Sequence, residues 1–545
     1  MLRQKEIGGV TLLRPRTDSE SQFRAYAEDH LRSKYDVGTY SDASEINSIL
    51  RWQFEFLNGE LQNTIKHLSS RSLITFLLSQ YDATCKIRAI YQGGKLSEPD
   101  RQYWERQGPT IRRSIKHLCE LVTLAAADQP PREDRFGTYY VKHLEGAIIA
   151  CEMVVELYAL SDHVHLLSPN NSTLTIFAPG NEQYYDLQFG KDERHDDYIR
   201  RVVTDTNTRR KFLDSLPPDR DVAFQAKSLD DSFVTELGFS YRHGIAALTE
   251  LINNVQQPDP DAFDVPFIAR DMILTGWRET PGWPHQVTEK IIGAFELDRP
   301  RLEKRAVFKP QQEHRALRRG LFAFPHASGQ HLIYSREMAR ECLISLISGI
   351  SFQKLPAEWR TPVTRKAAGA LQNRCGEWFE QQVARNMSLL GVVGQRSFSG
   401  ALERKGNRIS VPADIGDLDY LGYSDRDKSI ILIECKFLDS GMEPRFYRDD
   451  ISAFVTNNPS FSSKLLKKAE WVRKNAGAVC RAISSLTDER SAIEPTKLLT
   501  AFVTLVPTFA SYFVADFPCV SLSEFVNEYK TDNRWPYSTG IFTLE

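Results

Sequence analysis

Two runs in the C-terminal part of the chain read Gly416-Asp417-Leu418-Asp419-Tyr420-Leu421 and Ile430-Ile431-Leu432-Ile433-Glu434-Cys435-Lys436. Acidic residues flank and interrupt the first apolar run, and a Glu-x-Lys triplet ends the second. Ile430 to Ile433 are apolar at every position, which is typical of a central strand covered on both faces. Burying a carboxylate or an ammonium costs several kcal/mol unless the charge is paired or binds a metal. Charges at these positions therefore indicate a functional site.

The polar segment between the two runs, Ser424-Asp425-Arg426-Asp427-Lys428, has the composition of a turn. The sequence therefore predicts an antiparallel hairpin whose turn is centred near Arg426. Because side chains alternate along a strand, Glu434 and Lys436 share one face, and Asp419 falls opposite or nearly opposite Glu434. Opposed residues have Cβ atoms about 4.5–5.5 Å apart, close enough for two carboxylates to bind one ion.

Carboxylate ligands suit Mg²⁺ or Mn²⁺ better than zinc. A lysine beside them can orient a water molecule or stabilise the charge that develops on a phosphate. The alternative is an exposed strand whose charges only keep it soluble, and the apolar residues on both faces argue against it. All twelve histidines lie at or before His331, so residues 332–545 alone cannot supply histidine-based nuclease chemistry or histidine ligands to zinc.

In order and spacing, Asp419, Glu434 and Lys436 resemble the catalytic motif of the PD-(D/E)XK nuclease superfamily, which has the restriction-endonuclease-like fold. The form GEWFE … GDLDYL … IECK looks most like the Mrr-like and NERD-like branches. The resemblance covers roughly residues 366–480. It implies that Asp419 and Glu434 hold Mg²⁺ or Mn²⁺ and that Lys436 positions the hydrolytic water.

Many members of the superfamily also carry a helical glutamate four residues after a glycine, and Gly376-Glu377-Trp378-Phe379-Glu380 fits that pattern. The resemblance thus implies Glu380 as a further catalytic carboxylate and metal ligand, with Glu377 as its rival. The Pro-Asp dipeptide of the superfamily is absent, and Pro412-Ala413-Asp414 comes nearest to it. The choice of the metal-binding aspartate therefore stays open among Asp414, Asp417 and Asp419, with Asp419 preferred.

Composition predicts an ordinary soluble protein of two to four domains, since 545 residues carry a net charge of −2 and 41% of them are hydrophobic. The eight cysteines are scattered singly without a CxxC pair, which indicates the reduced thiols of a cytoplasmic protein. No membrane-spanning segment is expected, because the longest apolar stretch, Ala147 to Leu160, contains Glu152 and Glu156.

Apolar residues at helical spacing predict a mostly helical region over residues 1–355, for example from Ile46 to Leu68. Within it, three short runs (His163-Leu167, Thr173-Ala178 and Tyr184-Phe189) predict a small β-meander at about 163–189. Pro356 and Pro362 bracket an expected linker. Beyond it, a helix at about 366–390, the hairpin, a basic helix and a buried strand at Leu498-Val506 predict an α/β domain over residues 356–545.

Two basic stretches are candidates for nucleic-acid binding. Lys464, Lys467 and Lys468 share a face at helical spacing and follow the predicted site strands. Residues 299–319 contain eight basic residues, among them Arg315, Arg318 and Arg319, against two acidic ones. Each phosphate that such residues neutralise would release counterions. The alternative for the second stretch is a solvated helix or linker face.

The sequence thus predicts an α+β multidomain protein: a mostly helical region with a small β insertion, then a restriction-endonuclease-like domain with a central mixed sheet. The expected function is metal-dependent hydrolysis of phosphodiester bonds in DNA, and the architecture resembles that of bacterial defence nucleases. One alternative is a catalytically inactive protein of the same fold that binds nucleic acid or a protein partner. Another is an RNA-directed nuclease. The helical region is expected to recognise substrate, bind a protein partner or restrain activity, and whether it also forms a homo-oligomer stays open.

Overall fold

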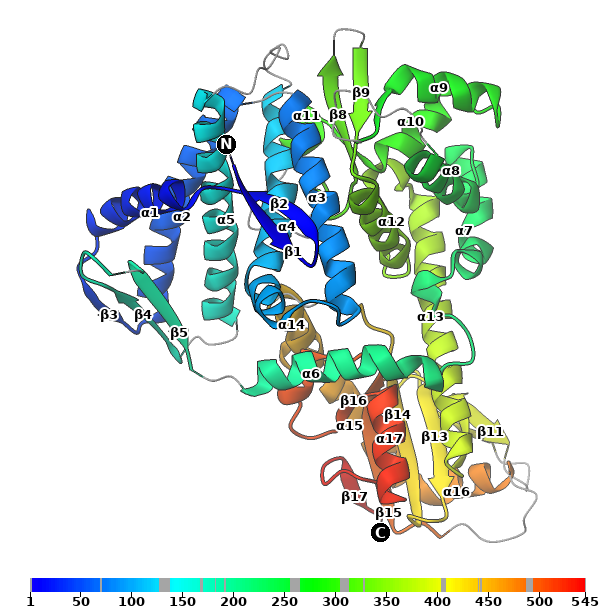
Figure 1. The fold of residues 1–545 in the computed structure, drawn as a ribbon. Coiled ribbons are helices and arrows are strands. Elements are labelled where there is room, and N and C mark those ends of the chain that lie inside the picture. The colour runs from blue at the N-terminus through cyan, green and yellow to red at the C-terminus, as the bar shows by residue number, and fades with distance from the viewer. Residues whose placement is uncertain are drawn as a thin grey trace. The chain divides into compact units, whose positions relative to one another are not determined.

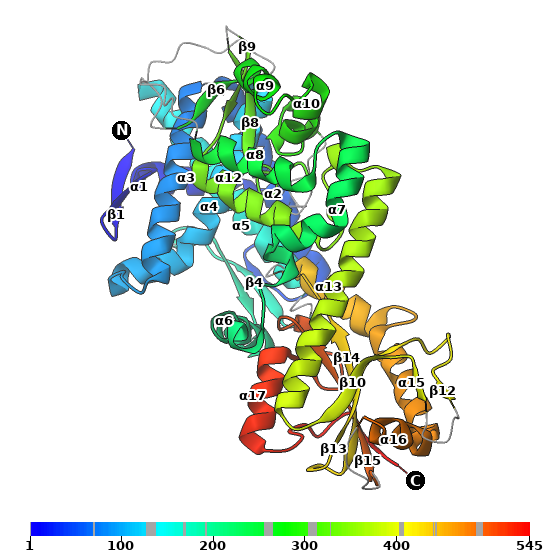
Figure 2. The same ribbon diagram turned by 90° about the vertical axis from the view of Figure 1, so that its right-hand side faces the viewer.

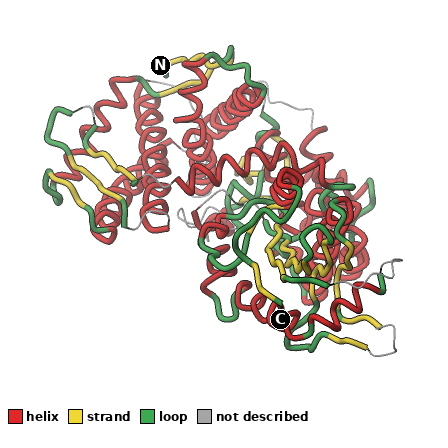
Figure 3. The backbone as a smooth tube through the Cα atoms, turned by 90° about the horizontal axis from the view of Figure 1, so that it is seen from below, coloured by secondary structure: helices red, strands yellow, loops and turns green. Residues whose placement is uncertain are grey.

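The chain forms two compact units of mixed α and β structure. The first comprises Met1–Gly190 and Val222–Ala368, and the second comprises Lys191–Asp221 and Gly369–Glu545. Figure 3 shows that helices make up much of the chain and that strands occur in separate groups. The computed structural model describes residues 2–68, 71–126, 138–166, 170–181, 183–190, 193–254, 265–303, 313–326, 329–402, 408–439, 441, 444–486 and 494–544.

The first unit is built mainly from long helices whose apolar faces pack together. The pattern from Ile46 to Leu68 lies in α2, as predicted, and Ile46, Leu57 and Leu61 are completely buried there. No described helix combines the length and the apolar composition that crossing a membrane requires. The helices of the unit are α1 (Thr17–Arg32), α2 (Ala43–Leu68), α3 (Arg71–Gln92), α4 (Glu98–Ala126), α5 (Thr138–Leu166), α7 (Val222–Leu237), α8 (Tyr241–Asn254), α9 (Arg270–Glu279), α10 (His285–Gly293), α11 (Arg299–Leu302), η3 (Ala357–Trp359) and α12 (Arg336–Ile350).

The predicted β-meander is right for two of its three strands. β4 (Ser172–Ile176) and β5 (Tyr185–Phe189) pair antiparallel, but the expected strand at His163-Leu167 is wrong because α5 continues to Leu166. Val164 is completely buried in the core that α5 shares with α2, and this packing extends the helix. The third strand of the sheet is β3 (Gly38–Tyr40), which comes from far earlier in the chain.

Two further strand groups of the first unit were not predicted. β1 (Arg3–Ile7) and β2 (Val10–Arg14) form a hairpin, and a second sheet has the order β6-β9-β8-β7. Its strands are β6 (Phe267–Ala269), β7 (Glu296–Leu297), β8 (Leu321–His326) and β9 (Gly329–Ile333). The expected linker at Pro356–Pro362 is instead packed, since Trp359 is completely buried and its indole donates to the carbonyl of Lys290.

A mixed sheet forms the centre of the second unit. Among the described residues it has six strands in the order β10-β13-β14-β15-β16, with β17 paired to β15. The β13–β14 pair is antiparallel and the β14–β15 pair is parallel, so a helical crossover connects the latter two. The strands are β10 (Val393–Phe398), β13 (Leu418–Ser424), β14 (Ser429–Lys436), β15 (Lys497–Thr504), β16 (Cys519–Ser521) and β17 (Ile541–Thr543), beside a separate hairpin of β11 (Gly400–Leu402) and β12 (Arg408–Ser410).

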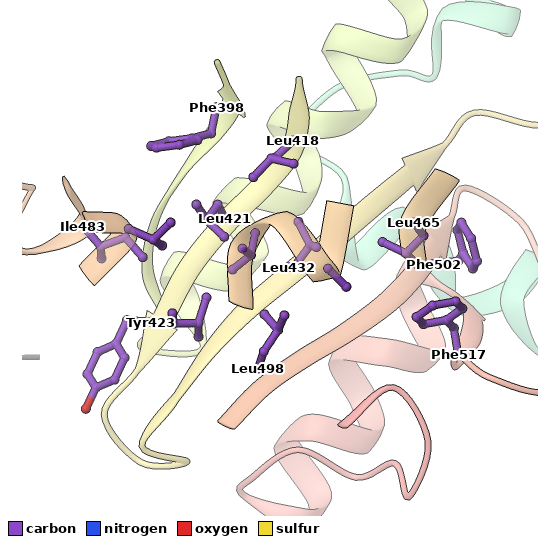
Figure 4. Packing of buried hydrophobic residues seen from close by; sticks show 14 of the residues in the cluster. Phe398, Leu418, Leu421, Tyr423, Leu432, Leu465, Ile483, Leu498, Phe502 and Phe517 are labelled. Atoms are coloured by element: carbon purple, nitrogen blue, oxygen red, sulfur yellow. The ribbon is translucent and has the colours of Figure 1, made fainter. Parts of the chain in front are cut away.

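Helices cover both faces of this sheet. Figure 2 shows α17 (Leu522–Asp532) and the lower part of α13 (Pro362–Leu389) on one face, and α15 (Phe461–Lys474) and α16 (Ala476–Ser484) on the other. The crossover also contains α14 (Pro444–Ile451) and the π-helical segment η4 (Ser452–Thr456), and η5 (Phe509–Tyr512) follows β15. Figure 4 shows Leu421 and Leu432 of the hairpin in the same buried cluster as Leu465 of α15 and Ile483 of α16.

One segment of the second unit comes from the first half of the chain. α6 (Glu193–Thr208), η1 (Arg209–Phe212) and η2 (Pro218–Arg220) lie with the sheet domain, and α6 packs against α17 (Figure 1). Arg201 of α6 forms an ion pair with Glu524 of α17 at 2.6 Å. The units therefore differ from the expected division at 355/356: the boundary falls inside α13, and residues 191–221 belong with the C-terminal part.

Candidate active site

The hairpin that carries the site has the predicted register. Tyr420 of β13 pairs with Ile433 of β14, so the same register sets Asp419 opposite Glu434. Gly416, at φ +75°, adopts the left-handed conformation in the turn that leads into β13. β14 lies between β13 and β15 and is buried along its length, except that Lys436 at its end is partly exposed. The central strand thus places two charged side chains at the edge of the core.

Both carboxylates are held by short contacts. The backbone N–H of Cys435 donates to Asp419 Oδ2 at 2.8 Å. Lys436 Nζ donates to Glu434 Oε1 at 2.8 Å, and Lys468 Nζ of α15 donates to Glu434 Oε2 at 2.6 Å. Lys468 Nζ also lies 3.6 Å from Asp419 Oδ1. Two carboxylates and two ammonium groups therefore form one mutually compensated cluster.

The electrostatics of the cluster divide the two acids. Burial, strengthened by the negative charge of Glu434, raises the pKa of Asp419 to about 7. Burial alone would also raise the pKa of Glu434, but Lys436 and Lys468 outweigh it and lower that pKa. For Lys436, burial opposes the charged form, yet the attraction of Glu434 and Asp419 raises its pKa. Glu434 is thus the permanent anion of the cluster, and Asp419 is the group whose charge responds to its surroundings.

The structure distinguishes Asp419 from its two rivals. Asp414 and Asp417 are exposed, whereas the Asp419 side chain is only 17% exposed and contacts the cluster. Among the described residues, no contact joins Glu380 of α13 to Asp419 or Glu434. Its Oε2 accepts from Ser397 Oγ at 2.6 Å. Burial raises the pKa of Glu380, and the charge of Glu434 contributes to that shift. Glu380 therefore interacts with the cluster only through the electrostatic effect of Glu434. Its rival Glu377 is exposed.

Lys468 belongs to the cluster, whereas the sequence grouped it with Lys464 and Lys467 as a nucleic-acid contact. That placement of Lys468 is wrong, because its side chain is only 9% exposed and lies on the apolar face of α15. Lys464 and Lys467 are exposed, as the prediction requires. The helical spacing of Leu465, Ala469 and Val472 around Lys468 could have predicted its burial, since these apolar residues mark the buried face of the helix.

The second predicted nucleic-acid surface is wrong for two of its three named arginines. Arg315 is buried and donates to Glu120 of α4 at 2.8 Å, and Arg319 is 1% exposed and donates to Glu358 at 2.8 Å. These buried guanidinium groups compensate buried or partly buried carboxylates and so cannot track a phosphate backbone. Arg318 is half-buried and donates to Ser345 Oγ at 3.0 Å. Lys304, Arg305 and Lys309 lie outside the described residues.

Two residues of the cluster, Asp419 and Glu434, are suitable carboxylate ligands for a divalent metal ion. Among the described residues, no three side chains of histidine, cysteine, aspartate or glutamate are grouped closely enough to hold a metal. Mg²⁺ commonly uses one or two carboxylates and completes its shell with water and substrate phosphates, so Asp419 and Glu434 suffice for it. The Lys468 ammonium beside both carboxylates shows that a positive charge is accommodated there.

Comparisons of the chain with protein-family models, with curated proteins and with solved structures found no match. The function of the site is therefore inferred from its own geometry and chemistry, and the resemblance to nucleases stays a prediction.

Proposed function

We propose that the second unit is a metal-dependent nuclease whose active site is the cluster of Asp419, Glu434, Lys436 and Lys468. The observation that carries the proposal is the burial of Glu434 near the end of a central strand, with Asp419 opposite it and the buried Lys468 beside both. A protein that needed only a stable sheet would be at least as stable with apolar residues here. The mixed sheet with helices on both faces is also compatible with the nuclease fold that the sequence resembles.

The residues of the cluster have distinct roles in this proposal. Asp419 and Glu434 would hold a divalent cation, which would supply Lewis-acid stabilisation of the scissile phosphate and activation of the attacking water. Lys436, held by Glu434 at the open end of β14, orients the water and balances charge on the phosphate. Lys464 and Lys467 contact phosphates on either side, and DNA is the proposed substrate.

The test is a cleavage screen with Mg²⁺ or Mn²⁺ over linear, circular and single-stranded DNA and over RNA. Glu434→Gln and Lys436→Met should each lower the cleavage rate at least 100-fold, because each removes charge from the reacting phosphate or its metal. Asp425→Asn serves as the control, since Asp425 is an exposed carboxylate at the hairpin turn and pairs with Lys428. Undiminished cleavage by both site variants would refute the proposal, and cleavage of RNA alone would change the substrate.

A second candidate function is nucleic-acid binding without cleavage. The observation that favours it is that lysines of the chain already bind both oxygens of Glu434, so the charges are compensated without a metal. In that case the wild type would bind DNA or RNA with the same affinity in EDTA as in Mg²⁺, and no substrate in the screen would be cut.

A further inference from the structure

The Lys468 ammonium lies close to both carboxylates of the candidate metal site. Its Nζ is 2.6 Å from Glu434 Oε2 and 3.6 Å from Asp419 Oδ1. Lys436 uses the other oxygen of Glu434, and the backbone of Cys435 uses the other oxygen of Asp419. Glu434 Oε2 and Asp419 Oδ1, the oxygens nearest Lys468, are therefore the ones available to bind a shared cation.

The position of Lys468 on α15 is not that of an ordinary surface lysine. Ser460 caps the helix by accepting from the backbone N–H of Ser463, and this cap fixes where the helix begins. Leu465, Ala469 and Val472 then turn the face that carries Lys468 toward the sheet. An unpaired ammonium on that face would be strongly destabilising, so its pairing with Glu434 and Asp419 accounts for its burial there.

A divalent cation and the Lys468 ammonium cannot both occupy the space between these two oxygens. Mg²⁺ requires carboxylate oxygens at about 2.0–2.1 Å in a near-octahedral arrangement, which leaves no room for an ammonium at hydrogen-bonding distance on the same side. The two positive charges would also repel each other strongly at that separation, because little water screens them there. Lysine has four rotatable side-chain bonds, so its ammonium can withdraw while α15 stays in place.

We infer that Lys468 is an internal counter-ion that occupies the cation position of the site, and that a divalent metal binds by displacing it from Asp419 and Glu434. The inference rests on the proposed function only in taking these two carboxylates as the metal ligands. It makes Lys468 the residue that sets the metal affinity of the site. Lys468 keeps the carboxylates paired until the metal concentration suffices to replace it.

Titration of the full-length protein with Mn²⁺, followed by the electron paramagnetic resonance of the free ion and without nucleic acid, tests this inference. Lys468→Met should bind Mn²⁺ at least tenfold more tightly than the wild type, because no ammonium has to be displaced. Lys468→Arg keeps the charge and should show no such gain. Lys474→Met, at an exposed position in the last turn of the same helix, is the matched control and should leave the affinity unchanged.

Thermal melting provides a second readout in case Lys468→Met folds poorly. That variant leaves Glu434 and Asp419 without one of their counter-ions, so it should melt below the wild type in EDTA and gain more in melting temperature from Mn²⁺. Lys468→Gln, which keeps a donor without the charge, should behave in the same direction. Equal or weaker Mn²⁺ binding by the Met and Gln variants, or no binding by any variant, would overturn the inference.

Cleavage assays separate this inference from the proposed function. If Lys468→Met tightens Mn²⁺ binding but neither the wild type nor any variant cuts nucleic acid, the counter-ion role stands and the nuclease proposal fails. If the wild type cuts in a Glu434-dependent manner and Lys468→Met leaves the Mn²⁺ affinity unchanged, the nuclease proposal stands and the counter-ion role fails.

Discussion

At the scale of single residues, the two carboxylates of the site differ in the groups that compensate their negative charge. Glu434 interacts with two lysines, whereas Asp419 has one backbone hydrogen bond and a longer approach to Lys468. This asymmetry explains why burial raises the pKa of Asp419 while the lysines lower that of Glu434. The same asymmetry makes Asp419 the less costly of the two acids to neutralise.

Replacing Asp419 by asparagine should therefore weaken metal binding with little loss of stability. The asparagine side chain can still accept from the backbone of Cys435, but it lacks the charge that a divalent cation requires. We expect Asp419→Asn to weaken Mn²⁺ binding at least tenfold and to reduce any cleavage by orders of magnitude. Asp417→Asn is the control, because Asp417 is exposed and two residues away in the same run. A larger effect at Asp417 than at Asp419 would contradict the assignment.

At the scale of single elements, α15 places its lysines in different surroundings. Lys468 is buried against the sheet, whereas Lys464, one turn before it, and Lys467, next to it in sequence, are exposed. Lys464 Nζ lies 6.0 Å from the ring of Phe461, and Lys436 Nζ lies 4.8 Å from the same ring. One aromatic side chain thus links the candidate site to the exposed lysines of the helix.

Reversing the charge of Lys464 and Lys467 together should weaken nucleic-acid binding in a salt-dependent way. If each lysine neutralises one phosphate, the slope of log K against log salt should fall by about 1.4–1.8, depending on the strand form. Fluorescence anisotropy with a labelled oligonucleotide at several salt concentrations measures this slope. Lys497→Glu is the control, because Lys497 is exposed and pairs with Ser429 at the opposite end of β14 from the site. An equal change in the control would show that the effect is one of net charge.

A carboxylate on α14 should make the stability of the second unit depend on pH. Burial raises the pKa of Asp450 to about 6 from an ordinary value of 3.8, and Asp449 and Asp439 add to the shift. The folded state therefore holds this proton more tightly than the unfolded state does. Stability from this group is complete below about pH 4 and is lost as the pH rises to about 6.

Asp450→Asn should remove that dependence, because asparagine carries no charge and still accepts from Thr508 Oγ1. The variant should match the wild type near pH 4 and exceed its free energy of unfolding by about 2–3 kcal/mol above pH 7, since one pKa unit corresponds to about 1.4 kcal/mol. Chemical denaturation at several pH values measures the difference. A difference that does not vary between pH 4 and pH 7 would contradict the assignment.

At the scale of the whole molecule, the second unit is completed by a segment that precedes it by about 150 residues in the chain. Arg201 forms its ion pair with Glu524 and also donates to Ser511 at 2.7 Å, and Asp205 accepts from Ser523. Asn386 of α13 donates to the carbonyl of Phe212 at 2.9 Å. α6 and η1 therefore cover polar groups that would otherwise be exposed at α17 and α13.

Residues 369–545 expressed alone should consequently be less stable than the same residues joined by a flexible linker to residues 191–221. Arg201→Met in the full-length protein should reproduce part of that loss, about 2–3 kcal/mol, because it leaves a partly buried Glu524 unpaired. Arg200→Met is the control, since Arg200 is 75% exposed in its pair with Asp197. Calorimetry or circular dichroism measures each melting transition. Equal stability of the two fragments would show that the segment only docks on an autonomous domain.

The features that the sequence alone determined are those that depend on short-range alternation. The apolar run from Ile430 to Ile433, the polar turn and the two-residue period of a strand were enough to predict the hairpin and its register. They therefore also predicted that Asp419 lies opposite or nearly opposite Glu434, and the structure places it directly opposite. The apolar period of α2 is local in the same way, and the helix forms where the pattern predicts it.

Only the tertiary structure decided which other charges lie beside those two carboxylates and which are buried elsewhere. Lys468 is 34 residues from Glu434, and Arg315 is 195 residues from Glu120. In the sequence both basic residues looked like parts of exposed basic stretches. Their burial depends on the face that each element turns toward a distant partner, which chain packing sets and residue spacing does not. A buried charge requires its counter-ion to be near in space, at whatever distance along the chain, and the sequence does not give that distance.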